Sequence, residues 1–556
     1  MRGIHCETEL QCDLKYLHPV SALKGIDQAS RLLSEAILSQ KQILIIGDFD
    51  ADGATATALT YRALGLFGHA RRDYLVPNRF QFGYGLTPEI VDQAAEAKPD
   101  VIITVDNGIS SVKGVEKAKA LGIQVVITDH HLPGNKHPAA DAIVNPNQKG
   151  CEFPSKNLAG VGVAFYLMLA LKNSLLESGY FKAQGLPQPN LAELLDLVAL
   201  GTVADVVPLD QNNRILVEQG LRRIRSGRCC AGISALFKIA KRNVQRAVSS
   251  DLGFVCGPRI NAAGRLDDMS LGIECLLSDD PQTALQLAGA LDDLNIERRA
   301  IEQEMQEEAL QFLQEYDKEM LSGDIPPVLC LYKENWHQGV VGILAARIRE
   351  RYHRPTIIFA PADHECVNQN AEIKGSGRSI PGLHLRDILD EVATANPGLL
   401  DKFGGHAMAA GLSLKKICFD DFADAITQVV KAHADDETFD EIQHSDGELQ
   451  AQEFDLKCAD ELRYAAPWGQ HFPAPLFDNR FVVITKRILK DKHLKLLLCP
   501  IDTKQNRGRN VSAIAFNVDF KDWPEEGGEV HLLYKLDVNE YQGSCSLQLM
   551  VERIVL

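Results

Sequence analysis

An acidic stretch that directly follows an apolar run is the feature that most constrains how this chain can fold. The run Ile43–Ile46 is typical of a buried parallel strand, and it leads into Gly47-Asp48-Phe49-Asp50-Ala51-Asp52-Gly53. In an extended backbone, Asp48, Asp50 and Asp52 would point to the same side. Three carboxylates so close together repel one another and lose hydration, so we expect a divalent cation to offset that cost. The simpler alternative, an acidic turn whose last residues only cap a helix, leaves the first two carboxylates unexplained.

The same rhythm of strand, acidic turn and helix recurs in the next part of the chain. The strand-like run Val101–Val105 is followed by Asp106, and Ile123–Thr128 is followed by Asp129-His130-His131. Strands that alternate with helices indicate a doubly wound, mostly parallel α/β sheet. Ligands bind such sheets beyond the carboxyl ends of the strands, and all three acidic clusters fall there.

Aspartate and histidine are the candidate metal ligands at this edge of the sheet. A neutral imidazole binds a divalent metal, and a neighbouring carboxylate can orient it. His130 and His131 should face opposite ways on an extended segment, so that one binds metal and the other meets substrate. Asp205 ends a further apolar segment, and the residues before it, Leu191–Val203, have the pattern of a helix. The mixture suits Mn²⁺ or Mg²⁺, and two such ions about 3.5–4 Å apart would form a phosphoesterase centre. Taken singly, each cluster could be an ordinary turn or a cap.

Three glycine-containing clusters suggest an anionic substrate. They are Gly257–Arg265, Ser376–Ser379 and Phe403–Gly411, and each contains an arginine or a histidine. We expect exposed backbone amides there, because glycine lets the backbone approach an oxyanion closely, and arginine can grip a phosphate with two hydrogen bonds. A glycine-rich turn is more often only a turn, so an anionic substrate is supported by the three clusters together and not by any one of them.

The last part of the chain predicts a small β-barrel of the OB type. Five β-patterned segments occur at residues 480–489, 493–501, 509–518, 529–537 and 545–555. Basic residues gather among them, at Lys486, Arg487, Lys490, Lys492, His493, Lys495, Lys504, Arg507 and Arg509. Interleaved aromatic residues, Phe481, Phe516, Phe520 and Trp523, would suit a barrel that binds single-stranded nucleic acid. For Phe481 and Phe516, burial in the barrel core is the favoured interpretation.

Charge and composition narrow the class of protein. A net charge of −17 argues against a protein that coats duplex nucleic acid nonspecifically, and it makes the basic cluster of the barrel more informative. The 13 cysteines are scattered without a C-x-x-C pair, which is typical of free thiols in a reducing compartment. The amino terminus has no apolar core of signal-peptide length, and no long uncharged apolar run follows. We therefore expect a cytoplasmic protein with no membrane contact.

These patterns predict an α/β protein of several domains. A doubly wound, mostly parallel sheet is joined by a long helix to a second, smaller α/β domain, and an OB-like barrel follows. The expected segments are an N-terminal helical segment (1–40), a catalytic domain (41–280), a linker helix (281–322), a second α/β domain (323–436), a connector (437–479) and the barrel (480–556).

The motifs resemble those of a known family. Asp50-Ala51-Asp52, Asp106, Asp129-His130-His131 and Asp205 resemble, in order, the four motifs of the DHH phosphoesterase superfamily. Gly404-Gly405-His406 with Ala409-Ala410-Gly411 resembles the associated second domain, DHHA1. With the long helix and the terminal barrel, the chain is similar to the RecJ family of single-strand-specific 5′→3′ DNA exonucleases. Phe49 stands where tyrosine is common in that family.

The resemblance implies roles for individual side chains. The implied metal ligands are Asp50, Asp52, Asp106, His130 and Asp205, with Asp106 bridging two ions and Asp48 as a further ligand or outer support. Asp129 would orient a histidine, His131 would contact the scissile phosphate, and His406 would hold that phosphate from the second domain. The residues expected to bind DNA or its phosphates are Arg259, Asn261, Arg265, Ser376, Arg378, His406, Lys490 and Lys492.

The implied activity is hydrolysis of single-stranded DNA from its 5′ end to 5′-mononucleotides with two Mn²⁺ or Mg²⁺ ions, in DNA repair and recombination. We expect a monomer, with a single-strand-binding protein and a helicase as protein partners. One alternative is a small-substrate phosphoesterase of the same superfamily, acting on nanoRNA, phosphoadenosine phosphate or a cyclic dinucleotide, although such relatives lack the long helix and the barrel. Another is a non-catalytic strand-binding scaffold, which would have lost its metal ligands.

Overall fold

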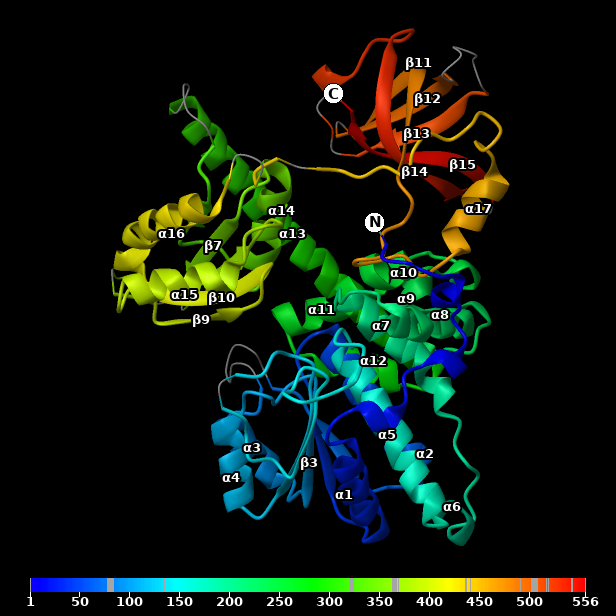
Figure 1. Ribbon diagram of the computed structural model, residues 1–556, viewed down its shortest axis with the longest axis vertical. Coiled ribbons are helices and arrows are strands. Elements are labelled where there is room, and N and C mark those ends of the chain that lie inside the picture. The colour runs from blue at the N-terminus through cyan, green and yellow to red at the C-terminus, as the bar shows by residue number, and fades with distance from the viewer. Residues whose placement is uncertain are drawn as a thin grey trace. The chain divides into compact units, whose positions relative to one another are not determined.

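The structure of the protein is a computed structural model, and it divides into two compact units (Figure 1). The first unit comprises Met1–Gly264, Asp268–Asp292 and His444–Leu556, and the second comprises Arg265–Asp267 and Asp293–Gln443. The described residues are 2–77, 85–134, 136–319, 325–362, 368, 370–435, 438–440, 442–490, 492–501, 509–516, 518, 520–541 and 544–555. Lys504 and Arg507 of the basic cluster, and the expected domain ends at residues 322 and 436, lie outside them.

A five-stranded parallel sheet forms the centre of the first unit. Its strands are β1 (Ile43–Ile46), β2 (Arg72–Leu75), β3 (Val101–Val105), β4 (Gln124–Thr128) and β5 (Ala142–Val144), in the order β2-β1-β3-β4-β5. Every residue of β1 and β3 is buried, as expected for central parallel strands covered on both faces. The predicted doubly wound parallel sheet is confirmed.

Helices account for most of the rest of the chain between residues 26 and 277. Those that alternate with the strands are α1 (Ile26–Leu38), α2 (Ala51–Leu66), α3 (Pro88–Glu96) and α4 (Val112–Ala120). The helical region that follows contains α5 (Gly160–Glu177), α6 (Tyr180–Ala183), α7 (Leu195–Ala204), α8 (Gln211–Arg225), α9 (Ala231–Ile239), α10 (Ser249–Asp251), α11 (Gly257–Leu266) and α12 (Ser270–Leu277). Among the described helices, α5 alone is long and apolar enough to cross a membrane, and 67% of it is buried inside the protein.

The long helix α13 (Pro281–Glu319) leads from the first unit into the second, which is a mixed α/β unit. Its strands are β6 (Leu329–Tyr332), β7 (Thr356–Pro361), β8 (Glu372–Arg378), β9 (Lys402–Gly405) and β10 (Ala409–Lys415), in the order β6-β7-β8-β10-β9. The pair β6 and β7 is parallel, and the other neighbours are antiparallel. Its helices are α14 (Val341–Tyr352), α15 (Leu385–Ala395) and α16 (Phe419–His433).

The prediction of exposed backbone amides is wrong for two of the three glycine-containing clusters. Gly257–Arg265 lies in helix α11, and Ser376 lies in β8, where it pairs with Ile358 on one side and Gly411 on the other. The backbone groups there are committed to secondary structure. Glycine serves close packing instead: a Cβ at Gly377 would lie 2.6 Å from a methyl group of Leu385.

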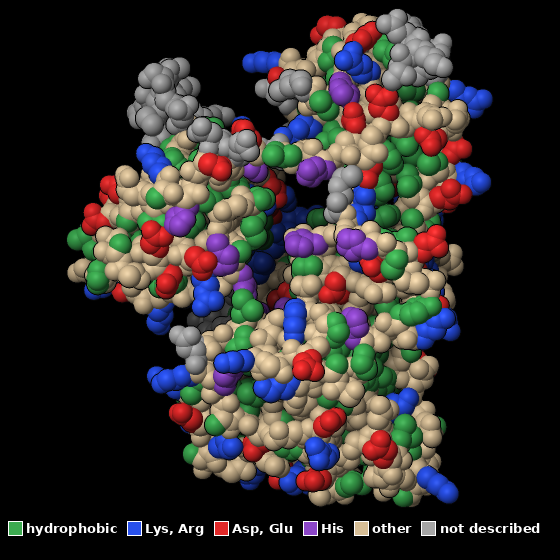
Figure 2. All heavy atoms as spheres, in the orientation of Figure 1, with side chains coloured by type: hydrophobic (Ala, Val, Ile, Leu, Met, Phe, Trp, Pro, Cys, Tyr) green, Lys and Arg blue, Asp and Glu red, His purple; other side chains and the backbone are tan. Residues whose placement is uncertain are grey.

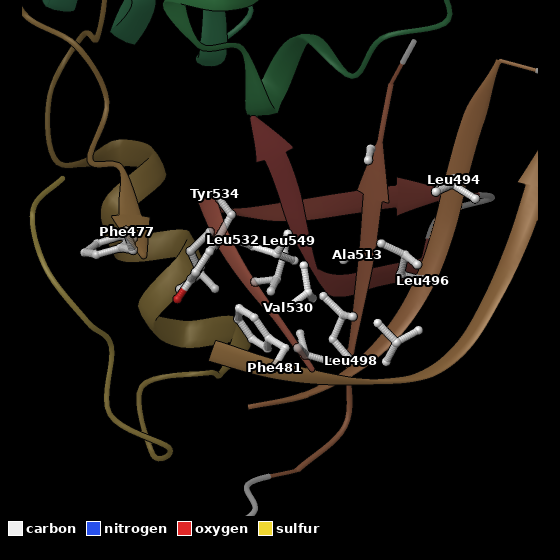
Figure 3. Packing of buried hydrophobic residues seen from close by; sticks show 14 of the residues in the cluster. Phe477, Phe481, Leu494, Leu496, Leu498, Ala513, Val530, Leu532, Tyr534 and Leu549 are labelled. Carbon is white, nitrogen blue, oxygen red and sulfur yellow. The ribbon is translucent and has the colours of Figure 1, made fainter. Parts of the chain in front are cut away.

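The C-terminal strands form a closed barrel, as predicted. They are β11 (Phe477–Leu489), β12 (His493–Ile501), β13 (Val511–Ala515), β14 (Glu529–Tyr541) and β15 (Ser544–Ile554), joined in the order β11-β12-β13-β15-β14. Figure 3 shows leucine, valine and aromatic side chains from these strands filling the interior. Phe481 is fully buried there, whereas Phe516 is 48% exposed, so its predicted burial is wrong. Val511, Ala513 and Ala515 of β13 are buried, so the same alternation directs the next residue, Phe516, outward.

The barrel is attached to the helical region of the first unit by polar contacts. Arg246 forms ion pairs with Asp460 of α17 (Leu456–Tyr464) at 2.7 Å and with Glu540 of β14 at 3.0 Å. The backbone N–H of Leu209 donates to the carbonyl of Gln470 at 2.8 Å.

On the face of the molecule shown in Figure 2, acidic and basic side chains are interspersed.

Candidate metal centre

Acidic side chains meet at the carboxyl edge of the parallel sheet. Asp48 follows β1, Asp106 follows β3, and Asp129-His130-His131 follows β4. Because β1, β3 and β4 are adjacent parallel strands, the residues after them lie at the same edge. Asp48, Asp106 and Asp129 are each at most 3% exposed.

The loop after β1 does not stay extended, so the predicted alternation of its three carboxylates is wrong. Asp50 is the N-cap of α2, and its side chain accepts a hydrogen bond from the N–H of Gly53 at 2.9 Å. Asp52 therefore lies in the first turn of the helix, and Asp50, not Asp52, is the cap. The oxygens of Asp52 accept N–H groups of Gly160 at 2.6 Å and Val161 at 2.9 Å, at the start of α5. These donors and the helix dipole stabilise its negative charge.

Asp205 reaches the cluster from a helix, in agreement with the helical pattern predicted for Leu191–Val203. It is the C-cap of α7 and follows the buried apolar residues of that helix. One of its carboxylate oxygens, Oδ2, is buried and accepts no hydrogen bond from the residues that the structure describes. The same oxygen lies 3.5 Å from Nε2 of His130.

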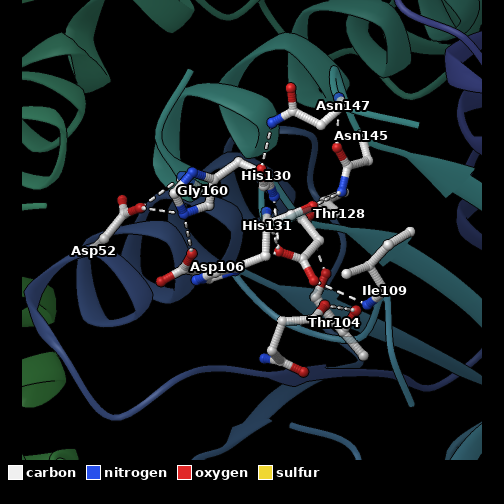
Figure 4. A network of polar contacts seen from close by, with 12 residues as sticks. Asp52, Thr104, Asp106, Ile109, Thr128, His130, His131, Asn145, Asn147 and Gly160 are labelled. Carbon is white, nitrogen blue, oxygen red and sulfur yellow. Dashed lines mark hydrogen bonds and ion pairs between the residues drawn. The ribbon is translucent and has the colours of Figure 1, made fainter. Parts of the chain in front are cut away.

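Three groups of candidate ligand atoms form at this edge, each with its atoms within 4.8 Å of one another. The groups are Asp52 with His130 and Asp205, Asp106 with His130 and His131, and Asp48 with Asp50 and Asp106. Nε2 of His130 lies 3.1 Å from Oδ1 of Asp106 and 3.9 Å from Oδ2 of Asp52 (Figure 4). Carboxylate oxygens with one or two imidazoles are a donor set that suits Mn²⁺ or Mg²⁺. His130 and Asp106 each belong to two groups and thus link all three.

His131 is held by Asp129, although the two histidines do not face opposite ways. The ring centroids of His130 and His131 are 4.4 Å apart, so the imidazoles lie side by side. Nδ1 of His131 is 2.8 Å from Oδ1 of Asp129, whose other oxygen accepts the N–H of Ile109. Burial works to lower the pKa of His131, but the hydrogen bond and charge of Asp129 outweigh it and raise that pKa to about 9.

The carboxylates around His130 are strongly perturbed. Burial, followed by the charge of Asp50, raises the pKa of Asp52 to about 7. Burial and the neighbouring carboxylates also raise the pKa values of Asp106 and Asp205 well above their ordinary range. Bound cations would stabilise the ionised form of these acids and so lower their pKa values.

Two asparagines that were not predicted from the sequence hold the two histidines. The side-chain amide of Asn145 donates to the backbone carbonyl of His131 at 2.9 Å, and that of Asn147 donates to the carbonyl of His130 at 2.6 Å (Figure 4). Both follow β5, the next strand of the sheet. The signal available in the sequence was an asparagine pair directly after a fourth apolar run. Gly160 was also missed: a Cβ there would lie 2.5 Å from the side chain of Asp106.

The other predicted site residues lie in three places. In α11, Arg259 pairs with Asp292 at 2.9 Å and donates to the carbonyl of Val255, and Asn261 accepts a hydrogen bond from the acidic loop. In the second unit, Arg265 donates to the carbonyl of Gly339, Arg378 donates to Ser376 Oγ at 3.1 Å, and His406 lies between β9 and β10. In the barrel, Lys490 and Lys492 are exposed at the turn between β11 and β12.

Comparisons with known proteins agree along the whole chain. Residues 42–202 match the DHH family N-terminal domain, residues 326–432 the DHHA1 domain and residues 445–553 the RecJ OB domain. The single-stranded-DNA-specific exonuclease RecJ of Dickeya dadantii is 53% identical over 555 residues, spanning 100% of this chain and 94% of the relative. That of Escherichia coli is 51% identical over 554 residues, with the same coverage.

Solved structures are similar as well. The crystal structure of RecJ from Thermus thermophilus in complex with Mn²⁺ has a TM-score of 0.77 and 29% sequence identity, covering 100% of this chain and 74% of that chain. The corresponding Mg²⁺ complex has a TM-score of 0.72, 27% identity and a coverage of 100% and 73%.

The raised pKa values predict how stability depends on pH and metal. The pKa of Asp52 is about 7 in the folded state against an ordinary 3.8, so its protonated form favours folding and that contribution is lost as pH rises toward 7. We expect the melting temperature in EDTA to fall between about pH 5 and pH 8, and Mn²⁺ to raise it more at about pH 8 than at about pH 5. Differential scanning calorimetry measures both. In EDTA at the higher pH, Asp106→Asn should be more stable than wild type. A rise in melting temperature on adding Mn²⁺ that is the same at both pH values would contradict the prediction.

Proposed function

The chain belongs to the RecJ family of single-stranded-DNA-specific exonucleases, and from this premise we propose that it removes 5′-mononucleotides from single-stranded DNA in the 5′→3′ direction. It is a metal-dependent nuclease, and we propose two cations, Mn²⁺ or Mg²⁺, and a place in DNA repair and recombination. The observation that carries the proposal is the convergence of Asp48, Asp50, Asp52, Asp106, His130 and Asp205 on one edge of the parallel sheet.

The side chains present fit such ions. The donors are carboxylates and imidazole, and the buried Oδ2 of Asp205 accepts no hydrogen bond from the described residues. Asp106 and His130 are shared between the ligand groups, which supports a pair of ions rather than one. These residues would hold the ions, and the chemistry that divalent cations would supply there is neutralisation of phosphate charge and activation of a water molecule. We assign Asp48 to the ligands, because it shares a group with Asp50 and Asp106.

His131 is the residue that we propose to contact the scissile phosphate. Its Nδ1–H donates to Asp129, so Nε2 is the ring atom directed toward substrate. The side chain is 32% exposed, in contrast to the fully buried side chain of Asp129. A proton held on Nε2 would donate a hydrogen bond to a non-bridging phosphate oxygen and stabilise the charge that develops during hydrolysis.

The second unit is proposed to hold the 5′ end and nearby phosphates through Arg265, Ser376, Arg378 and His406. Burial and the positive charge of Arg349 lower the pKa of Arg378. A bound anion would stabilise the charge of this guanidinium group, which supports a phosphate contact there. For Arg259 the ion pair with Asp292 supports a structural role more than a phosphate contact.

The barrel is proposed to bind the strand away from the metal centre. Lys490 and Lys492 are exposed, and the exposed ring of Phe516 makes an edge contact with His493 at 5.0 Å between centroids. Cationic side chains beside an exposed aromatic ring are the combination that binds phosphates and stacks on bases. A small-substrate phosphoesterase needs no such surface.

End-blocked substrates test the activity. We expect a single strand with a blocked 3′ end to be degraded in Mn²⁺, while a strand with a blocked 5′ end and a blunt duplex resist. Asp106→Ala removes a ligand shared by two groups, so turnover should fall about 10³-fold or more, because metal charge stabilisation contributes several kcal/mol. Binding of single strands by the barrel should persist in this variant. Degradation only from the 3′ end, or full activity of Asp106→Ala, refutes the proposal.

Variants of the barrel test the strand-binding surface. Phe516→Ala should weaken binding of single-stranded DNA by about 1–3 kcal/mol, the value of one stacked base. Lys490→Ala with Lys492→Ala should reduce the slope of log K against log salt by about 1.4, since each phosphate contact on a single strand contributes about 0.7. The matched control is Lys15→Ala with Lys457→Ala, two other exposed lysines. Fluorescence anisotropy at several salt concentrations gives both quantities, and equal slopes for the two pairs contradict this assignment.

A further inference from the structure

Helix α11 presents three residues on one face to the segments that carry the acidic ligands. Gly257, Asn261 and Gly264 are spaced at i, i+4 and i+7, which is the repeat of a single helix face. All three belong to the first unit, as do the ligands of the metal centre. Asn261 was expected to bind phosphate, but its side-chain oxygen is used within the protein.

The contact of Asn261 is with the acidic loop itself. Its Oδ1 accepts a hydrogen bond from the backbone N–H of Ala51 at 2.7 Å. Ala51 is the first residue of α2 and stands between Asp50 and Asp52. The first N–H groups of a helix have no acceptor within the helix, so Asn261 supplies one from outside. The bond fixes the backbone at Ala51, between the candidate ligands Asp50 and Asp52.

Gly264 lies against the same loop one helical turn further on. A Cβ at this position would lie 1.9 Å from the carbonyl oxygen of Phe49 and 3.0 Å from its carbonyl carbon. Phe49 stands between Asp48 and Asp50. Only a residue without a side chain allows α11 to approach this backbone so closely.

Gly257, at the start of the helix, lies against the other ligand-bearing segment. A Cβ there would lie 3.0 Å from the Cβ of Ala204, the last residue of α7. Asp205 follows as the C-cap of that helix. One face of α11 therefore touches both the loop with Asp48, Asp50 and Asp52 and the segment that ends in Asp205.

We propose that α11 is a brace that sets the spacing between the acidic loop and Asp205, and that Asn261 and Gly264 are positioning residues for cation binding. The carboxylates repel one another, so the loop needs an attachment that resists their separation when the cations are absent. This inference rests on the proposed function, in which these carboxylates hold Mn²⁺ or Mg²⁺. It assigns Asn261 and Gly264 of the Gly257–Arg265 motif to metal positioning and leaves DNA contacts to other residues, Arg265 among them.

Direct metal binding tests the brace. Isothermal titration of Mn²⁺ into the full chain without DNA should show an affinity about 10- to 100-fold weaker for Asn261→Ala than for wild type, the usual effect of losing a group that orients a ligand. The KM for single-stranded DNA at saturating Mn²⁺ should stay within about twofold, because the strand contacts are intact. Asn261→Asp keeps an oxygen acceptor for the Ala51 N–H and should recover most of the lost affinity.

A matched control separates positioning from stability. Asn243 also accepts a backbone N–H through Oδ1, from Gln245 at 3.0 Å, and takes no part in the ligand groups. Asn243→Ala should leave the Mn²⁺ affinity unchanged. Gly264→Ala is the second variant, and it should weaken Mn²⁺ binding at least as much as Asn261→Ala, because its added methyl group meets backbone.

The outcomes are distinct. Unchanged Mn²⁺ affinity in folded Asn261→Ala and Gly264→Ala overturns the brace and leaves the nuclease assignment standing. A raised KM for DNA with unchanged Mn²⁺ affinity also overturns it and identifies Asn261 as a strand contact. If the wild-type chain itself binds no Mn²⁺, the proposed function fails and the brace fails with it. Weaker Mn²⁺ binding in both variants but not in Asn243→Ala supports the brace.

Discussion

Mutual repulsion among buried carboxylates is the constraint on which the organisation of the first unit depends. Asp48, Asp52 and Asp106 are at most 3% exposed, and burial together with their neighbours raises the pKa values of Asp52 and Asp106. Part of the charge is offset by the protein, through the N–H groups at the start of α5 that bind Asp52. The remainder is what divalent cations are suited to offset. The parallel sheet and the helices packed on it hold acidic groups at distances that a flexible chain would avoid.

An acidic protein that acts on an anionic polymer must concentrate its attraction for the strand in a few places. The chain carries a net charge of −17, so long-range electrostatics oppose DNA binding. The proposed contacts overcome this locally, through the cations of the metal centre, His131, and the exposed lysines of the barrel. Stacking on Phe516 adds attraction that does not depend on charge or base sequence. Such a distribution favours a flexible single strand, whose bases are accessible, over a duplex, whose bases are already stacked.

The sequence predicted the sheet and the barrel well, because apolar runs of strand length determine both. Ile43–Ile46 and Val101–Val105 are strands with the predicted bounds, and the five barrel strands lie near the predicted segments. The errors occur where backbone direction changes. Asp52 was placed on an extended segment, whereas the helix already starts at Ala51. The pattern of apolar residues does not show at which residue a helix starts.

Glycine was the least informative residue in the sequence and among the most informative in the structure. Glycine-containing clusters beside arginine and histidine were interpreted as phosphate-binding loops, yet Gly257 and Gly264 lie within a helix and Gly377 lies within a central strand. In each case the missing side chain is what allows two elements to approach. A phosphate-binding loop and a close helix contact both select glycine, and only the surrounding backbone separates them. Around the candidate metal centre, Gly160, Gly257 and Gly264 contact ligand residues or their neighbours. The absence of a side chain at these positions therefore allows the helices to pack closely against the segments that carry the ligands.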